Sequence, residues 1–526
     1  MRIVGNRFSF FGMVLWFAPL GLAAQTSPVE AVRAYRVAHG PAILKGFAEL
    51  LSIPNVARDS VGINRNAVYI RDALRELGVQ SELLRLPGAP PIVYGELDVP
   101  GATRTLGIYV HYDGQPVDSS RWTNAPWAPT LYTRAIEDGG TRRDFPGDGE
   151  SIDPEWRIYA RSAGDDKAPI GALLPVLRAF REAGISPTSN IRFFFDGEEE
   201  AGSPRLRQYL ETNRDRLDGI DVWLFFDGPV HQSRRPLLTF GVRGVTGMQV
   251  TIYGSIRPLH SGHYGNWAPV PGQMLAELLA SMKDRDGNVL VEGFYDTVEP
   301  LGELERAALA ALPDYDDELK RELGLFRTEG SGASLAERLL LPSLTVRGLA
   351  SANVGALARN IIPATATAAL GIRLVKANDP EHMKDLVEAH IRRQGYHIVR
   401  EDPNREIRLR YPRIAKVTRS GGYAAARTPM NLPIVRQVVR AMRRVAGDDL
   451  VVIPTLGGSL PLYLFTDVMA KPALILPIAN HDDNQHAADE NLRIANLWYG
   501  IDLYAALLTM PVDDGAIEPP SSGPRR

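Results

Sequence analysis

The run FFFDGEEEAGS, from Phe193 to Ser203, puts three consecutive carboxylates at the end of an apolar strand. Glu198, Glu199 and Glu200 repel one another and resist burial, so a buried strand can end in them only beside a cation or a proton. A metal ion is the simplest such partner. This run therefore predicts a buried sheet with a charged site at the end of at least one strand.

Other apolar runs end in the same way. RTLGIYVHYDG is typical of a buried strand that runs into His111 and Asp113, and DVWLFFDG of one that runs into Asp227. A fourth run, ALILPIANHDDNQHAADEN, delivers His481 and His486. Because ligands bind beyond the carboxyl ends of the strands in an open α/β sheet, we expect these distant side chains to converge.

Asp165 and Asp166 stand just before a segment with apolar residues at helical spacing. The candidate set then contains two histidines, at least three carboxylates and no thiol, because the chain has no cysteine. Such donors suit zinc, with manganese or cobalt as possible substitutes. Each motif alone also fits a structural explanation, since acidic runs are commonly solvated helix faces. Their joint occurrence after several strands favours a metal site.

The motifs VHYDGQPVD, SAGDDK, DGEEEAGS, FFDG, LHSGHYG, ARNIIP, GGSLP and HAADEN occur in this order along the chain. They resemble those of the co-catalytic dinuclear zinc metallopeptidases, a family that includes carnosine dipeptidases, carboxypeptidase G and aminoacylases. The resemblance covers nearly the whole chain after the N-terminal segment. It implies an α/β catalytic domain of the zinc-exopeptidase type, with a mixed, largely parallel sheet flanked by helices.

Carried over by position, the family pattern implies that Asp165 bridges two zinc ions. Glu200 and His486 would bind one ion, and His111 and Asp227 the other. General chemistry agrees, because two metal ions a few ångströms apart need a shared carboxylate. His481 precedes the expected ligand by five positions, so we expect it beside the metal and not on it.

Glu199 falls on the family's general base, and Glu198 is expected to be a neighbour only. Asp113 would accept a hydrogen bond from the second ring nitrogen of His111 and fix its tautomer. The implied reaction is attack of a zinc-bound hydroxide on an amide carbonyl, after which Glu199 passes the proton to the leaving amine.

The glycine-rich family pattern before and after Asp165 is altered in this chain. Ala160, Ser162 and Ala168 stand where glycine is usual. Small residues remain, so the backbone can still approach closely, and the ligand itself is intact. The changes bear on local geometry or substrate fit and not on metal binding.

Between Phe240 and about Pro412 the pattern changes to strand, helix, strand, strand, helix, strand. This order predicts a smaller α+β domain inserted into the catalytic domain, and the resemblance implies that it is a lid that also forms a dimer interface. The predicted parts are the catalytic domain at 25–242 and 413–511, and the lid at 243–412.

The LHSG motif of the lid contains His260, which by resemblance reaches the active site of the second subunit and polarises the scissile carbonyl. A solvated loop histidine is the alternative for His260. We interpret His263 as structural.

Four further residues are candidates for binding substrate. Asn360 and Arg373 match positions for the terminal carboxylate, for which a guanidinium offers a planar fork, although Arg373 also fits a surface charge at a strand edge. Gly458 and Ser459 can bring backbone donors close to a substrate, although Gly-Gly-Ser is also a common turn.

The N-terminus has the pattern of a cleavable secretory signal, with Arg2 and Arg7 before an apolar stretch from Phe8 to Leu22 and the small pair Ala23 and Ala24. We predict a signal peptide at 1–24 and a periplasmic or secreted protein, with a membrane anchor as the alternative. The segment 512–526 is rich in Pro, Gly and Ser and is predicted to be a disordered tail.

The net charge of −3 provides no basic surface for nucleic acid. We therefore interpret the protein as a two-zinc dipeptidase or exopeptidase that cleaves short peptides at a free C-terminal carboxylate, acting as a homodimer that is not membrane-bound after signal cleavage. An N-acyl amino acid amidohydrolase is the alternative within enzymes. A peptide- or metal-binding protein without turnover is the alternative from another class, and the presence of every expected ligand and of the base counts against it.

Overall fold

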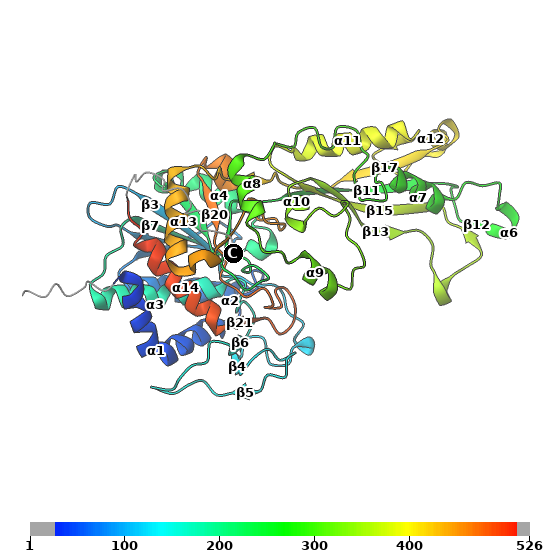
Figure 1. The fold of residues 1–526 in the computed structure, drawn as a ribbon. Coiled ribbons are helices and arrows are strands. Elements are labelled where there is room, and N and C mark those ends of the chain that lie inside the picture. The colour runs from blue at the N-terminus through cyan, green and yellow to red at the C-terminus, as the bar shows by residue number, and fades with distance from the viewer. Residues whose placement is uncertain (1–26, 513–526) are drawn as a thin grey trace, which may run out of the picture.

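The computed structural model of the protein describes residues 27–512. The predicted signal peptide lies outside the described residues, and so does the predicted tail after its first residue. Two domains are present, and the smaller one extends from the larger as an elongated arm (Figure 1). Among residues 27–512, no helix is both long and apolar enough to cross a membrane.

The catalytic domain is built on a mixed eight-stranded sheet with the strand order β1-β2-β7-β3-β8-β20-β9-β19. The four central strands β7, β3, β8 and β20 run parallel to one another. The strands are β1 (Gln80–Leu84), β2 (Ile92–Leu97), β3 (Thr105–His111), β7 (Asn190–Asp196), β8 (Val222–Phe225), β9 (Leu237–Thr239), β19 (Val451–Ile453) and β20 (Ala473–Ile475).

Both faces of this sheet are buried, which explains the unbroken apolar runs in the sequence. In β7, Phe193 and Phe195 face one core, and Phe194 faces a second core together with Trp223. Helices that pack against one another cover the first core, and shorter segments cover the second. The helices of this domain are α1 (Pro28–Leu51), α2 (Ser60–Glu76), α3 (Lys167–Ala183), α4 (Leu206–Thr212), α5 (Arg214–Leu217), α13 (Pro433–Ala446) and α14 (Ile494–Leu508).

The start of α3 is fixed to the end of α1 by Lys167. Its buried ammonium donates hydrogen bonds to the backbone oxygens of Leu50, at 3.0 Å, and Ile53, at 2.9 Å. Leu50 lies in the last turn of α1, where helix carbonyls lack partners within the helix, and Ile53 lies two residues beyond its end. Lys167 therefore holds in place the helix that follows Asp165.

A second, four-stranded sheet lies near the carboxyl ends of the central strands. It contains β4 (Thr130–Tyr132), β5 (Arg142–Arg143), β6 (Arg157–Tyr159) and β21 (Asn491–Arg493), in the order β21-β6-β4-β5. The pairing of β6 with β21 brings the segment before Asp165 beside the segment after His486.

The lid contains a five-stranded sheet in the order β13-β15-β11-β17-β16, with α7 and α11 packed on one face. The strands are β11 (Gly244–Tyr253), β13 (Ser343–Ala350), β15 (Thr365–Leu374), β16 (His397–Val399) and β17 (Ile414–Arg419), and the two helices are α7 (Pro271–Ser281) and α11 (Pro380–Arg393). β17 pairs with β11 in this sheet, so the lid extends beyond the predicted boundary at residue 412.

Shorter elements complete the inserted segment, and among them α8 packs against β19 of the catalytic domain. They are β12 (Leu259–His260), α6 (Ser261–Tyr264), α8 (Glu303–Ala310), α9 (Asp316–Glu322), α10 (Leu335–Leu339), β14 (Ile361–Ile362) and α12 (Arg405–Arg410). The pair β12–β14 and helix α6 lie at the end of the lid farthest from the catalytic domain (Figure 1).

Glu388 of α11 is a buried carboxylate that ties the lid together. It accepts hydrogen bonds from the guanidinium groups of Arg392, Arg400 and Arg419, at distances of 2.7 to 3.0 Å. Burial raises its pKa, but the arginines outweigh this effect and lower the pKa to about 2. All of these hydrogen bonds lie within the lid. Glu388 therefore stabilises the lid itself.

Candidate metal centre

Five predicted ligands converge at the carboxyl ends of the central strands. His111 is the last residue of β3, and Asp227 follows β8. Glu200 lies in the single turn η2 (Glu199–Ala201) after β7, Asp165 in the loop before α3, and His486 in the loop between β20 and β21. Parallel neighbours end at the same edge of a sheet, which is why residues so distant in sequence meet here.

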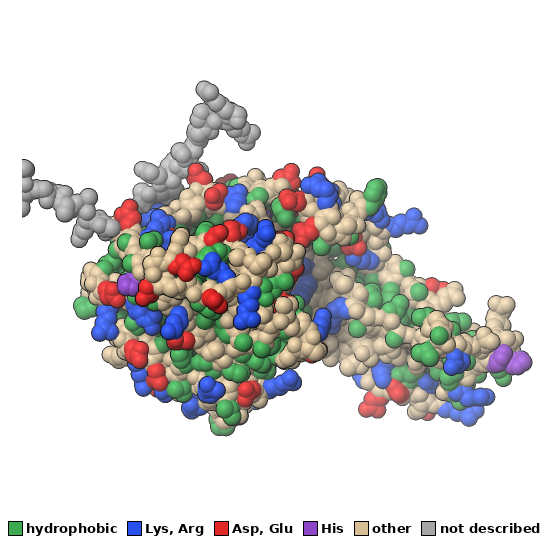
Figure 2. All heavy atoms as spheres, turned by 90° about the horizontal axis from the view of Figure 1, so that it is seen from below, with side chains coloured by type: hydrophobic (Ala, Val, Ile, Leu, Met, Phe, Trp, Pro, Cys, Tyr) green, Lys and Arg blue, Asp and Glu red, His purple; other side chains and the backbone are tan. Residues whose placement is uncertain are grey.

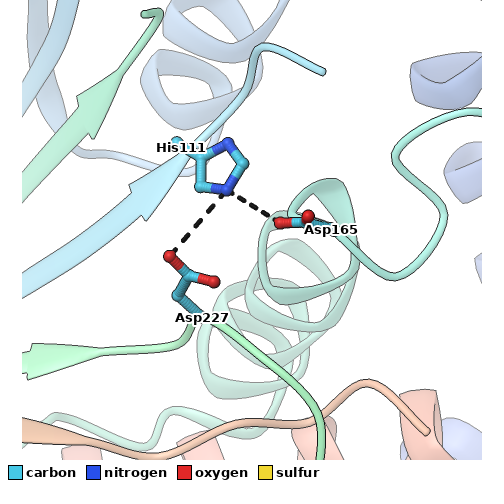
Figure 3. A group of neighbouring side chains, drawn as sticks. All are labelled: His111, Asp165 and Asp227. Atoms are coloured by element: carbon cyan, nitrogen blue, oxygen red, sulfur yellow. Dashed lines mark hydrogen bonds and ion pairs between the residues drawn. The ribbon is translucent and has the colours of Figure 1, made fainter. Parts of the chain in front are cut away.

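His111, Asp165 and Asp227 form the first ligand group (Figure 3). The Nε2 atom of His111 lies 2.9 Å from Oδ1 of Asp165 and 3.9 Å from Oδ2 of Asp227. All three residues are buried. Their side chains point toward one another from three separate segments of the chain (Figure 3).

Asp165, Glu200 and His486 form the second ligand group. The Nε2 atom of His486 lies 3.1 Å from Oδ2 of Asp165 and 3.3 Å from Oε2 of Glu200. Asp165 thus directs one oxygen toward each group, which is the geometry of a carboxylate that bridges two ions. The side chain of His486 is 54% exposed, so the second group lies on the open side of the site.

Burial and neighbouring charges shift the pKa values of Asp227, Asp165 and His486. Burial raises the pKa of Asp227 to about 7, helped by Asp165 and Glu200. Burial acts in the same direction on Asp165, but hydrogen bonds from His111 and His486 outweigh it and lower its pKa. The bonds to Asp165 and Glu200 raise the pKa of His486 to about 10. The crowded carboxylates thus favour the positively charged form of His486.

The site fits a pair of divalent ions. Within each group, the candidate ligand atoms all lie within 4.8 Å of one another. Oδ2 of Asp227 is buried and has no hydrogen-bond partner among the described residues. An unpaired buried oxygen is costly unless something positive binds it. Two imidazoles and three carboxylates without thiolate are donors that zinc accepts, and manganese or cobalt also.

Asp113 supports both the first ligand group and the turn that carries Glu199. One of its carboxylate oxygens lies 3.4 Å from Nδ1 of His111, and its backbone oxygen lies 3.2 Å from the same atom. The carboxylate also accepts the backbone N–H groups of Glu199, at 3.0 Å, and Glu200, at 3.2 Å. These last two contacts have no signature in the sequence.

Glu199 belongs to neither ligand group. Burial raises its pKa well above the usual value, and Asp227 and Glu200 add to this effect against the opposing influence of His111. Glu199 directly precedes the ligand Glu200 in the chain, and a carboxylate beside a metal site can serve as a general base. Glu198 instead pairs with Arg205, whose guanidinium lies 2.9 Å away.

Two amide side chains beside the ligands are not singled out by any sequence pattern. Gln485 donates from Nε2 to Oδ2 of Asp165 at 2.7 Å, and Gln115 donates from Nε2 to Oε2 of Glu200 at 2.7 Å. Gln115 stands inside the motif VHYDGQPVD and Gln485 directly before HAADEN, and this nearness to a ligand in the sequence is the available signal. Such donors orient a ligating carboxylate.

The altered residues around Asp165 fit the loop closely. Ser162 adopts φ +63°, in the left-handed region that favours glycine, and its hydroxyl accepts a hydrogen bond from the Asn55 amide at 2.7 Å. Ala160 and Ala168 are fully buried. The peptide bond between Asp165 and Asp166 is cis.

The predicted substrate-binding residues fall into two separate places. The guanidinium of Arg373, near the end of β15, donates a hydrogen bond to the hydroxyl of Ser459, and the backbone oxygen of Gly458 accepts from Arg243. Asn360 lies at the far end of the lid, where its backbone oxygen accepts from Ser261, next to His260.

His260 is not brought to the metal centre of its own chain. It is exposed at the far end of the lid, with its ring centroid 4.5 Å from that of His263. Figure 2 shows histidine side chains at the tip of the arm. His481 also stands apart from both ligand groups, and its Nδ1 atom lies 3.9 Å from the carboxylate of Asp482.

A sheet with two candidate ligand groups that share Asp165, together with an inserted α+β lid, is the architecture of a metallohydrolase. The model of peptidase family M20/M25/M40 matches residues 107–510, so the chain belongs to this family of metallopeptidases. This finding confirms the resemblance in the sequence, the predicted fold and the prediction of a metallopeptidase.

Relatives of known activity are similar over most of their length. The human Beta-Ala-His dipeptidase is 26% identical, and the match covers 95% of this chain and 96% of that protein. The Cys-Gly metallodipeptidase DUG1 of Saccharomyces cerevisiae is 28% identical, over 82% of this chain and 85% of that protein. Among solved structures, the M20 family metallo-carboxypeptidase Sso-CP2 from Sulfolobus solfataricus has a TM-score of 0.71 and 27% identity, and the match covers 89% of this chain and 98% of that one.

We predict that Asp165→Ala removes both tightly bound ions, because it deletes the ligand that the two groups share. The wild-type protein should hold about two zinc ions per chain, and the variant should bind zinc more than about 100-fold more weakly. Elemental analysis after gel filtration measures the zinc content of the wild-type protein and of the variant. His481→Ala is the matched control and should retain both ions, and two ions retained by Asp165→Ala would contradict the assignment of the bridge.

Proposed function

We propose that the protein is a two-metal dipeptidase that hydrolyses dipeptides or short peptides at the residue with the free C-terminal carboxylate. The observation that carries this proposal is the division of the site, with Asp165 shared between two ligand groups and Glu199 beside them but in neither. The activities in the names of the relatives, Beta-Ala-His dipeptidase and Cys-Gly metallodipeptidase, support the substrate class.

Zinc is the proposed resident metal, with manganese or cobalt as substitutes. Bound at this site, such ions supply Lewis acidity, which polarises an amide carbonyl and lowers the pKa of water. His111 and Asp227 would hold one ion, and Glu200 and His486 the other, with Asp165 between them. The donor set and the unpaired oxygen of Asp227 support this assignment.

The proposed role of Glu199 follows from its position and its raised pKa. Its carboxylate takes the proton from the attacking water and then delivers it to the nitrogen of the leaving amine. Asp113 holds the main chain of Glu199 in place by accepting its backbone N–H. A fixed main chain limits the reorganisation needed to position the base.

Arg373 and Ser459 are proposed to bind the substrate carboxylate. Their contact joins the lid to the loop after β19, and a guanidinium already oriented by a hydroxyl can offer two parallel N–H donors to a carboxylate. Gly458 adjoins Ser459 and adds exposed backbone to the same place. Asn360 is proposed to act on substrate only from a second subunit, together with His260.

We predict that Glu199→Gln lowers kcat by roughly 10²–10⁴-fold while the content of bound metal stays unchanged, since the amide cannot take up the proton. Turnover is measured on a panel of dipeptides and N-acyl amino acids. Glu198→Gln is the control and should retain most of the activity. Wild-type turnover by Glu199→Gln would refute the assignment of Glu199 as the general base. If the wild-type protein hydrolyses only the N-acyl amino acids of the panel, the amidohydrolase is favoured instead.

A homodimer is proposed from the surface of the lid. Large apolar side chains are exposed at its far end, among them Trp267 at 80%, Val354 at 87% and Ile256 at 71%. β13 is an edge strand of the lid sheet, and its second half is exposed. An apolar patch beside an unpaired strand edge favours association with another chain. A second copy bound there would carry its His260 toward the site of the first.

Complementation between two inactive variants tests this arrangement. We predict that His260→Ala and Glu199→Gln are each strongly impaired, and that subunit exchange between them restores activity. In the mixed dimer, one site combines an intact Glu199 with an intact His260 from the other subunit. Activity should therefore approach half the wild-type value per mixed dimer, and no recovery after verified exchange would refute a role across subunits.

The protein is further proposed to be periplasmic or secreted after removal of residues 1–24, on the evidence of the N-terminal sequence pattern alone. We predict that the protein recovered from periplasmic or culture fractions begins at Gln25. Intact-mass measurement and N-terminal sequencing check this prediction. A full-length chain recovered only with the cytoplasm or the membrane would contradict it.

A further inference from the structure

Glu490 is a fully buried carboxylate that the proposed mechanism does not use. It stands directly before β21 and four residues after His486. Oε1 accepts the backbone N–H groups of Gly164, at 3.0 Å, and Asp165, at 2.9 Å. Oε2 accepts the backbone N–H of Ser162 at 2.8 Å. A single carboxylate thus binds three N–H groups of the loop that presents the shared ligand.

The same carboxylate is also tied to the loop of His486. Oε2 accepts a hydrogen bond from the guanidinium of Arg161 at 2.7 Å, and this guanidinium donates to the backbone oxygen of Ala487 at 3.1 Å. The Arg161 guanidinium lies over the ring of Trp122, 5.0 Å from its centroid. Glu490 and Arg161 therefore connect the segment before Asp165 with the residue directly after His486.

The loop that Glu490 binds can adopt few other backbone conformations. A side-chain carbon at Gly164 would lie 2.6 Å from an oxygen of Asp483, closer than atoms in contact allow. Ser162 is already in the left-handed region, with φ +63°. Conformations of this kind persist only where the surroundings determine them, and the N–H groups bound by Glu490 belong to these same residues.

The position of Asp165 matters more than that of any other ligand, because its two oxygens must face different ions. Ligand side chains function only when they are held to within about 0.5 Å of the required geometry. Hydrogen bonds to the backbone N–H of Asp165 fix the point from which its side chain departs. Loss of these bonds would free the backbone from which the shared ligand departs.

We propose that Glu490 is a positioning residue of the metal centre, which holds the loops of Asp165 and His486 in the arrangement that binds two ions. This inference rests on the proposed two-metal site. Glu490 does not touch metal or substrate, and its effect is transmitted through the backbone of Asp165 and through Arg161. Groups that orient metal ligands in this way commonly change metal affinity by about 10–100-fold.

Glu490→Gln tests the proposal in the full-length protein. Glutamine keeps the size of the side chain but has one acceptor oxygen, so two of the four donors lose their acceptor. The matched control is Glu388→Gln, because Glu388 is an equally buried carboxylate that binds three arginines in the lid. Metal-free protein is titrated with cobalt(II), and the affinity, the number of ions bound and the visible absorption spectrum are recorded. Thermal unfolding without metal is measured alongside.

Glu490→Gln is expected to bind cobalt(II) at least 10-fold more weakly and with an altered spectrum. Glu388→Gln is expected to lower the unfolding temperature and to bind cobalt(II) within about twofold of the wild type. Glu490→Asp keeps both acceptor oxygens but withdraws them by one methylene, and its affinity should be intermediate. If Glu490→Gln does not fold, the cobalt(II) affinity of Glu490→Asp tests the inference instead.

The inference is overturned if Glu490→Gln binds two cobalt ions with wild-type affinity and spectrum, or if Glu388→Gln weakens binding as much. Where Glu490→Gln is unfolded, wild-type binding by Glu490→Asp overturns it. A wild-type protein that itself binds fewer than two ions would instead refute the proposed two-metal site. The two failures are therefore distinguished by the wild-type titration alone.

Discussion

The shared carboxylate of Asp165 is the constraint on which the rest of the structure depends. Its oxygens lie 2.9 Å from His111 and 3.1 Å from His486, in two groups that also contain Asp227 and Glu200. Three carboxylates this close repel one another, and their burial is compensated only by protons or metal ions. A cluster of this kind does not stabilise a core. The surrounding fold must therefore hold the ligands together.

Strand order and loop contacts make different contributions to this organisation. β3 and β8 are parallel neighbours, so His111 and Asp227 reach the same edge of the sheet from the backbone pairing alone. Asp165 lies on no strand of that sheet, and its position depends on side chains that bind its loop. Asp113 does the same for the turn of Glu199 and Glu200. Two buried carboxylates that accept backbone N–H groups, Asp113 and Glu490, thus stand behind the ligands.

Ligands that directly follow an apolar strand, or that stand in a motif, could be predicted from the sequence. Apolar runs buried on both faces of the sheet end directly in His111 and near Asp227, so these ligands could be identified from the strand that precedes them. Gln485 and Gln115 could not be identified as donors to ligands, because a polar residue in a loop has no periodicity and its contact depends on the path of the loop.

The lid shows the same limit of the sequence. Its helices and strands follow from their apolar periodicity, but their spacing contains no information on where the far end lies relative to the catalytic domain. Asn360 and His260 therefore lie together at the tip, apart from Arg373, although all three match family positions for substrate. β17 belongs to the lid because it pairs with β11, and a break in composition near residue 412 does not reveal this long-range pairing.

The two ligand groups are unequally exposed, and this difference sets the direction of access. His111 and Asp227 are closed in by the core of the sheet, whereas the side chain of His486 is 54% exposed. His486 also has φ +62°, a left-handed conformation that costs about 1–3 kcal/mol for a residue other than glycine. Like the buried Asp165, the exposed His486 is therefore held by loop contacts and not by a strand. The side chains of the other four ligands are at most 6% exposed, so His486 marks the side of the site that faces solvent.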